Sequence, residues 1–231
     1  MSGGGAVIRS AGNADTARLI RRFTVSERIA HWLLATAFAA MLTSGVFMGG
    51  IGPLRHHAML VAHVGSAVAL LCGIAALSAR RRSRRPLART VRDLRPLSSS
   101  DRQWLRLAPR AYLLGGELPP SGRFNAGQRV NARLVLLLLV LLYLSGLGEL
   151  GRFTPALAPF RIIGALHGLA AGAASVLVAG HIYLALLHRA TRPALRGMTL
   201  GSVRRDWAEH HHAEWVAAMD DEAARKSTAE R

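Results

Sequence analysis

Residues 164–187 constrain the fold of this chain more than any other stretch, because none of these 24 residues carries a formal charge. About 20 apolar residues at 1.5 Å each carry a helix across the hydrocarbon of a bilayer. Two histidines, His167 and His181, lie inside the stretch, 14 residues apart. That spacing returns the side chain to within about 40° of its first direction and about 21 Å along the axis. One face of a membrane helix therefore carries an imidazole near each side of the bilayer.

Ionisable side chains at such depth are costly and usually functional. A neutral imidazole is a common axial ligand of haem iron. Two haems stacked across a membrane would need this spacing, together with two partner histidines elsewhere in the chain.

The charges are segregated from four nearly uncharged runs. The chain has 30 Lys and Arg against 13 Asp and Glu, a formal charge of +17. In a soluble protein this balance would indicate nucleic acid, but these arginines lie beside the apolar runs, where the positive-inside rule explains them. The single cysteine, Cys72, excludes an internal disulfide and any cysteine-rich cluster. We therefore predict an all-α integral membrane four-helix bundle, with helices at about 29–50, 58–79, 130–150 and 162–188.

His31 and His63 are the candidate partners. His31 begins the first run, and Gly45 follows it at the same spacing of 14 residues, where a glycine would let a porphyrin approach the backbone. The alternative for His31, an interfacial histidine in the headgroup region, is weakened by this repeated spacing. His63 lies near the start of the second run.

The arginine distribution predicts that both termini are cytoplasmic. The depths then pair His31 with His181 on the cytoplasmic side and His63 with His167 on the opposite side. The flanking regions are a flexible N-terminal tail (1–20), a basic cytoplasmic loop (80–129) inside a membrane domain (21–190), and a cytoplasmic C-terminal tail (191–231). Within the loop, residues 101–114 favour a short interfacial helix anchored by Trp104 and Tyr112.

Several motifs resemble the cytochrome b, or gamma, subunit of membrane-bound formate dehydrogenase, over nearly all of residues 21–220. They are RFTVSERIAHW from residue 22, AHVG around His63, RFNAGQR from residue 123, LHGLAAG and GHIYLALLHR in the fourth run, and the tail RGMTLGSVRRDWAEHHHAEW. The tail and NAGQ are the most specific of these, because apolar helices resemble one another by composition alone.

The resemblance implies two b haems with bis-histidine ligation at His31, His63, His167 and His181. It also implies a quinone pocket beside the cytoplasmic haem, near Asn125, Gly127 and Gln128. Electrons would come from an extracytoplasmic iron–sulfur (beta) subunit, and through it from a molybdenum or tungsten catalytic (alpha) subunit. They would pass to menaquinone or ubiquinone in a bacterial inner membrane. Formate chemistry itself would lie outside this chain.

Other interpretations remain open. The cytochrome b subunit of nickel–iron hydrogenase is a close relative of this family. A haem-free membrane anchor would explain the spans but not histidines matched by depth, and a small transporter would be expected to show internal repeats. Ala37-Phe38-Ala39 resembles a signal-peptidase site, although the apolar run continues past it. The C-terminal tail is either solvated helix or a contact with a partner subunit. Adjacent histidines 210–212 point in different directions on a helix, which argues against a metal site there.

Overall fold

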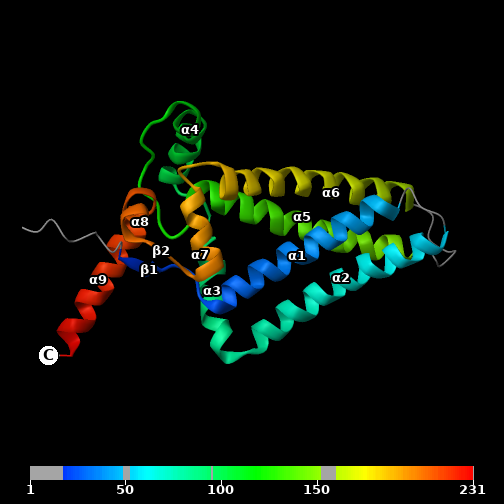
Figure 1. Ribbon diagram of the computed structural model, residues 1–231, viewed down its shortest axis with the longest axis horizontal. Helices are drawn as coiled ribbons and strands as arrows, with labels where there is room; N and C mark the ends of the chain where they lie inside the picture. Colours follow the sequence, from blue (N-terminus) through cyan, green and yellow to red (C-terminus); the bar gives the residue numbers. More distant parts are fainter. Residues whose placement is uncertain (1–17, 49–52, 95, 152–159, 231) are drawn as a thin grey trace, which may run out of the picture.

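The computed structural model describes residues 18–48, 53–94, 96–151 and 160–230. Two long helical hairpins lie side by side, and the remaining elements gather at one end of them (Figure 1). The elements in order are β1 (Leu19–Arg21), α1 (Val25–Met48), α2 (Pro53–Ala79), α3 (Arg81–Asp93), α4 (Ser99–Leu114), α5 (Ala126–Leu150), α6 (Phe160–Ile182), the π-helical turn η2 (Tyr183–Leu187), the 3-10 turn η3 (Arg192–Ala194), α7 (Leu195–Leu200), β2 (Ser202–Arg204), α8 (Arg205–His211) and α9 (Ala213–Ala229).

Among the described residues, four helices are long and apolar enough to cross a membrane, which confirms the predicted helical membrane bundle. They comprise α1, α5, and the segments His56–Ala79 and Ile162–Leu187. Two of them begin about one turn earlier than predicted, because side chains cap their polar first turns. Glu27 Oε2 accepts from the backbone N–H of Thr24 at 2.7 Å at the start of α1. At the start of α5, Gln128 N–H donates to Asn125 Oδ1 at 2.9 Å. The links at 49–52 and 152–159, and residues 1–17 of the predicted N-terminal tail, lie outside the described residues.

Small residues bring the helices of each hairpin together. A Cβ on Gly73 of α2 would clash with Leu33 Cδ2 of α1, so the glycine makes room for that leucine. In the second hairpin, a Cβ on Gly148 would lie 3.0 Å from Ile163 Cγ2. Close approach at small residues is the usual packing of helices in membranes. Between the hairpins, the hydroxyl of Tyr143 in α5 donates to the Ala67 carbonyl of α2 at 2.7 Å.

The segment 80–129 is more ordered than the predicted loop, since α3 and α4 occupy most of it. Helix α4 begins at a capping box in which Ser98 and Asp101 satisfy each other's backbone N–H groups. Trp104 is only 6% exposed and packs with Ala108 and Ala126. The expectation that Trp104 anchors the helix at the membrane interface is therefore wrong: its ring packs against the start of α5.

The all-α prediction also missed one small sheet. Strands β1 and β2 pair antiparallel, with Ile20 opposite Val203. These two residues share a small core with Ala208, Trp215 and Val216. Consequently residues 19 and 20 of the predicted flexible tail lie in a strand, and the predicted C-terminal tail folds against the bundle. We call the end of the bundle formed by residues 18–24, 80–125 and 188–230 the polar end (Figure 1).

Candidate functional site

The four histidines predicted from spacing meet in two pairs. The ring centroids of His31 (α1) and His181 (α6) are 6.1 Å apart. Those of His63 (α2) and His167 (α6) are also 6.1 Å apart. Helix α6 therefore contributes one histidine to each pair, and the first hairpin contributes the other. The rings of each pair are tilted or edge-on to each other, at interplanar angles of 67° and 58°.

The separation within each pair fits a shared metal. Metal–imidazole bonds of about 2 Å on both sides bring the two nitrogens to about 4 Å and the ring centroids to roughly 6 Å. His181 is exposed and the other three imidazoles are partly buried, so none is packed into a closed core. Imidazoles within apolar spans are costly unless they have a partner. Each pair is thus suited to bind the iron of one planar cofactor.

Hydrogen bonds occupy Nδ1 of His63 and leave Nε2 as the ring nitrogen that could bind a metal. Its Nδ1 lies 2.8 Å from the Met41 carbonyl and 3.2 Å from Ser44 Oγ. Because a carbonyl only accepts, Nδ1 carries the proton and donates it. The unprotonated Nε2 is then available to a metal, and the bond to the carbonyl also fixes the orientation of the ring.

The Nδ1 atom of His167 is also hydrogen-bonded, in this case by a residue of a different helix. Its Nδ1 lies 2.9 Å from Ser145 Oγ of α5. Ser145 donates its own proton to the Leu141 carbonyl at 2.6 Å, so toward His167 it accepts. Helix α5 contains no histidine, but it orients a histidine of α6.

A Ser-Gly dipeptide adjoins each of these two histidines. A Cβ on Gly45 would lie 3.4 Å from His63 Cε1, and a Cβ on Gly146 would lie 3.4 Å from His167 Cε1. Gly45 therefore lies beside the imidazole of His63. Sequence reasoning singled out Gly45 but missed its neighbour Ser44, as well as Ser145 and Gly146. The repeated Ser-Gly in the first helix of each hairpin is the signal that could have found them.

The His31/His181 pair is organised from the polar end. Trp32, whose ring meets His31 edge-on at 5.4 Å, donates its indole N–H to the Met198 carbonyl of α7 at 3.1 Å. Arg28 also donates to the Met198 carbonyl, at 3.3 Å, and to that of Thr199. Together they satisfy carbonyls at the end of α7, which lack partners within that short helix. No hydrogen bond among the described residues reaches the ring of His31 or His181.

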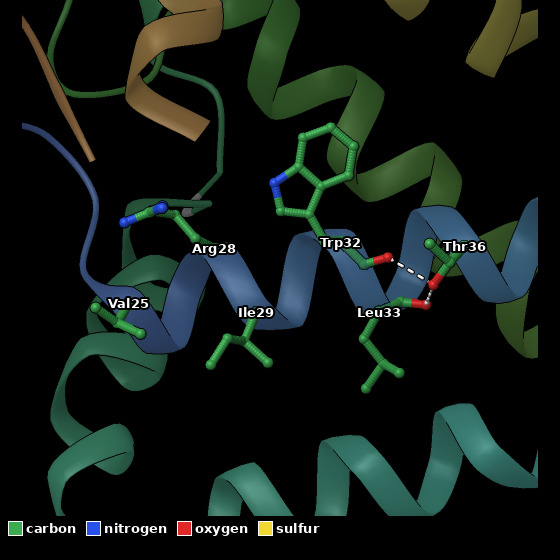
Figure 2. A pocket seen from close by; sticks show the side chains of 6 residues that line it. All are labelled: Val25, Arg28, Ile29, Trp32, Leu33 and Thr36. Carbon is green, nitrogen blue, oxygen red and sulfur yellow. Dashed lines mark hydrogen bonds between the residues drawn. The ribbon is translucent and has the colours of Figure 1, made fainter. Parts of the chain in front are cut away.

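A shallow groove of about 340 Å³ runs along the first turns of α1 and is lined by Val25, Arg28, Ile29, Trp32, Leu33 and Thr36 (Figure 2). Ile29 and Leu33 point toward α2, whereas Arg28 and Trp32 point to the other side of the helix. The Thr36 hydroxyl donates to the Trp32 carbonyl at 2.8 Å, within its own helix. The groove is thus lined mainly by apolar side chains.

Helix α6 changes character directly after His181. Residues Tyr183–Leu187 form the π-helical turn η2, and His188 N–H closes it on the Tyr183 carbonyl at 3.0 Å. Wider turns of this kind are rare and occur often at functional sites. The ring of His188 then meets Tyr112 of α4 edge-on at 5.1 Å. Burial raises the pKa of the Tyr112 phenol.

The predicted quinone residues surround the start of α5. The side-chain oxygens of Asn125 and Gln128 form a reciprocal capping box. A Cβ on Gly127 would lie 3.0 Å from Trp104 Cζ3, so the glycine makes room for the indole. The box uses the amide oxygens of both side chains and leaves their amide N–H groups for other acceptors.

The residues beside this motif form buried ion pairs. Arg123 lies 2.6 Å from Glu27 of α1 and 2.7 Å from Asp93 of α3. Arg129 of α5 pairs with Asp101 of α4. Arg123 thereby links α3 and the segment before α5 to the start of α1, the helix that carries His31.

His212 anchors the C-terminal tail to the segment before α5, and this residue is 1% exposed. Its Nδ1 donates to the Gly122 carbonyl at 2.8 Å. Burial first, and then the charge of Arg22, lowers the pKa of His212 to about 3. His212 therefore packs the C-terminal tail against the segment before α5.

Comparisons with known proteins agree with this architecture. Residues 22–201 match a family model described as prokaryotic cytochrome b561. The cytochrome b556(fdo) subunit of formate dehydrogenase from Escherichia coli strain K12 is 27% identical over 215 residues, which cover 90% of this chain and 97% of that protein. The subunits of the same name from strains O6:H1 and O157:H7 show the same identity and coverage. The similarity therefore extends over all four spans and the polar end.

Proposed function

The chain belongs to the prokaryotic cytochrome b561 family, and from this premise we propose that it is the di-haem b subunit that passes electrons from a formate dehydrogenase to a membrane quinone. Its family and its four apolar helices make it a multi-pass protein of the inner membrane. Membrane cytochromes b of this kind serve electron transport.

One observation carries the proposal: two histidine pairs with centroid separations of 6.1 Å, about 21 Å apart along α6. His31 and His181 would hold one haem b, and His63 and His167 the other. Bound haem b would supply reversible one-electron chemistry, and two axial imidazoles suit electron transfer better than oxygen binding. The protein's contribution is to orient the ligands, which the Nδ1 hydrogen bonds of His63 and His167 support.

The proposed topology places both termini and the polar end in the cytoplasm, since the arginines gather there. The His31/His181 pair would then lie toward the cytoplasm and the His63/His167 pair toward the opposite side. Moving one electron against a membrane potential stores about 2.3 kcal/mol per 100 mV. Electron entry on the far side and quinone reduction on the cytoplasmic side would therefore conserve energy.

The quinone would bind near Asn125, Gly127 and Gln128. The free amide N–H groups of Asn125 and Gln128 are the donors for a quinone carbonyl, because the capping box fixes their oxygens. The acceptor would be menaquinone or ubiquinone. The electron donor would be an iron–sulfur (beta) subunit, itself fed by a molybdenum or tungsten catalytic (alpha) subunit; a chain with the single Cys72 cannot ligate such clusters alone.

Haem quantification on the purified full-length chain tests the proposal. Pyridine haemochrome spectra should give two b haems per chain, falling to one in His63→Ala and to one in His181→Ala. His57→Ala, which changes an exposed histidine outside both pairs, is the control and should keep two. A folded chain that binds no haem would overturn the proposal and leave the membrane-anchor interpretation.

The quinone assignment has its own test. The variant Asn125→Asp/Gln128→Glu keeps both capping acceptors but removes the amide donors. Quinone reduction by the assembled complex should fall about tenfold, the value of one or two hydrogen bonds, while the haem content stays at two. Asn131→Asp, elsewhere on α5, is the matched control. An unchanged quinone KM in the double variant would move the quinone site away from α5.

A further inference from the structure

Arginines from three separate segments converge on one pocket at the polar end. The pocket measures about 370 Å³ and lies between the start of α1, helix α3 and the segment before α5. Six guanidinium-bearing residues line it: Arg21, Arg22, Arg85, Arg89, Arg92 and Arg123. The positive-inside rule requires arginines somewhere on this side of the membrane, but it does not require them to meet in a cavity.

The carboxylates nearby are already used by one arginine. Glu27, the acidic residue in the lining, accepts from Arg123 at 2.6 Å and from the Thr90 hydroxyl at 2.5 Å. Asp93 accepts from Arg123 Nε at 2.7 Å. Within the described residues, none of the other five lining arginines forms an ion pair. Glu222 of α9 is within electrostatic range of Arg89 but pairs with Lys226 at 2.7 Å. The pocket therefore carries a clear excess of positive charge.

Arg22 shows how strongly positive the pocket wall is. It is 4% exposed, and its Nε has no hydrogen-bond partner among the described residues. Its Nη2 donates to the Arg123 carbonyl at 2.8 Å, a neutral acceptor. Burial and the neighbouring charge of Arg123 lower the pKa of the Arg22 guanidinium to about 9. A buried cation beside a second cation is stabilised by a nearby anion.

The other arginines are arranged to reach that anion. Arg85, Arg89 and Arg92 recur at intervals of four and three residues, so they project from one face of α3. Helix α3 follows directly on the apolar α2, and the pocket adjoins the first turn of α1. Both positions are ends of membrane-spanning helices, the depth at which lipid headgroups lie. Guanidinium groups are well matched to the oxygens of a phosphate.

We propose that this pocket binds the phosphate of an anionic phospholipid headgroup. Lipid chains would lie along the apolar faces of α1 and α2, while Arg85, Arg89 and Arg92 close on the headgroup from the side of α3. The ligand fastens α3 to the start of α1, the helix that carries His31. This binding site is independent of haem and quinone.

Lipid binding to the full-length chain in neutral detergent tests the proposal. The probe is a short-chain phosphatidylglycerol, with phosphatidylcholine of the same chain length and inorganic phosphate as comparison ligands. Binding is followed by native mass spectrometry and by the rise in Tm. The pocket variant is Arg85→Gln/Arg89→Gln/Arg92→Gln. The control is Arg102→Gln/Arg106→Gln/Arg110→Gln, which removes the same charge from exposed positions of α4 outside the pocket.

Phosphatidylglycerol should bind the unchanged chain and the control alike and raise both Tm values. In the pocket variant its Kd should rise on the order of 100-fold, the combined effect of three arginines at a membrane surface. Equal weakening in both variants would overturn the proposal in favour of general charge attraction. Inorganic phosphate binding as tightly as the lipid would support the anion site and overturn its assignment to lipid. The Tm of each variant without ligand reports whether it is folded.

Discussion

The His63/His167 pair takes its supporting hydrogen bonds from inside the membrane spans, whereas the His31/His181 pair depends on the polar end. Met41 and Ser145 accept the Nδ1 protons of the first pair. Around the second pair, the described contacts run through neighbouring side chains, such as Trp32 to the Met198 carbonyl. One pair is held by the spans themselves, and the other by elements that fold onto them.

This difference implies that the two pairs respond to different perturbations. A change inside the hairpins should disturb His63 and His167 alone, and a change at the polar end should disturb His31 and His181 alone. Our proposed function assigns one haem to each pair. Optical and EPR spectra would then report on each pair separately, because each ligand geometry gives its own signal.

Replacing Arg123 should have the largest effect. Arg123→Met leaves Glu27 buried without its cation, which costs about 3 kcal/mol or more of stability. Glu27 lies one turn before His31 on α1, so we expect the His31/His181 haem signal to broaden and the His63/His167 signal to persist. Thermal unfolding followed by tryptophan fluorescence measures the stability loss.

The double variant Glu27→Gln/Arg123→Met removes both charges and should recover part of that stability, because position 27 then no longer buries an uncompensated carboxylate. Arg106→Met on the exposed face of α4 is the control. Equal broadening of both haem signals in Arg123→Met would show that the two pairs are not supported separately.

Removing Ser145 should weaken the other pair. Ser145→Ala takes away the Nδ1 acceptor of His167, and loss of such an orienting group typically lowers metal affinity 10- to 100-fold. Ser44→Ala should do less, because His63 keeps the Met41 carbonyl. Haem retention during titration with a competing apo-haemoprotein measures both affinities.

Ser175→Ala is the matched control for these serines. Among the described residues, the Ser175 hydroxyl bonds only to the Ala171 carbonyl of its own helix, at 2.8 Å. The idea of selective support by α5 fails if Ser44→Ala and Ser145→Ala lose haem equally, or if Ser175→Ala loses as much.

Acid should loosen the polar end through His212. The folded pKa, about 3, lies below the unfolded value of 6.5, so the stabilisation is complete above 6.5 and is lost as the pH falls toward 3. One pH unit below 6.5 the loss is about 1.4 kcal/mol. His212→Asn keeps an N–H donor for the Gly122 carbonyl without titrating in this range.

Tm measured across this pH range should therefore slope less in His212→Asn than in the unchanged chain. If the polar end supports only one pair, acid should disturb the His31/His181 haem signal first. A simultaneous change of both signals would contradict that.

The spans and the histidine pairs could be predicted because they depend on long, regular patterns. Apolar runs define the four helices, and the spacing of His167 and His181 places them on one face whatever the surroundings. The role of Ser145 could not be predicted in this way. It depends on which helix lies beside α6, and apolar helices do not specify their neighbours by pattern.

The structure of the polar end was harder to predict from the sequence, for a related reason. Strand β1 has three residues, too few to show an alternating pattern, and it forms only because β2 pairs with it from the far end of the chain. In the sequence, Arg123 looks like one more arginine in a basic segment. In the structure it is 8% exposed and forms ion pairs with two carboxylates. Burial of a charge is decided by tertiary partners, which local sequence does not show.

The smallest expected effect is that of Gly45→Ala. A Cβ there would lie 3.4 Å from His63 Cε1, an ordinary van der Waals contact, so Gly45→Ala should leave haem content and Tm nearly unchanged. Gly45→Leu should push the imidazole away and release the His63/His167 haem while the other stays. The pair Gly65→Ala and Gly65→Leu is the control, since a Cβ on Gly65 meets nothing within 4 Å. If Gly45→Ala already releases the haem, the glycine serves the cofactor directly, as its spacing from His31 first indicated, and the imidazole contact is secondary.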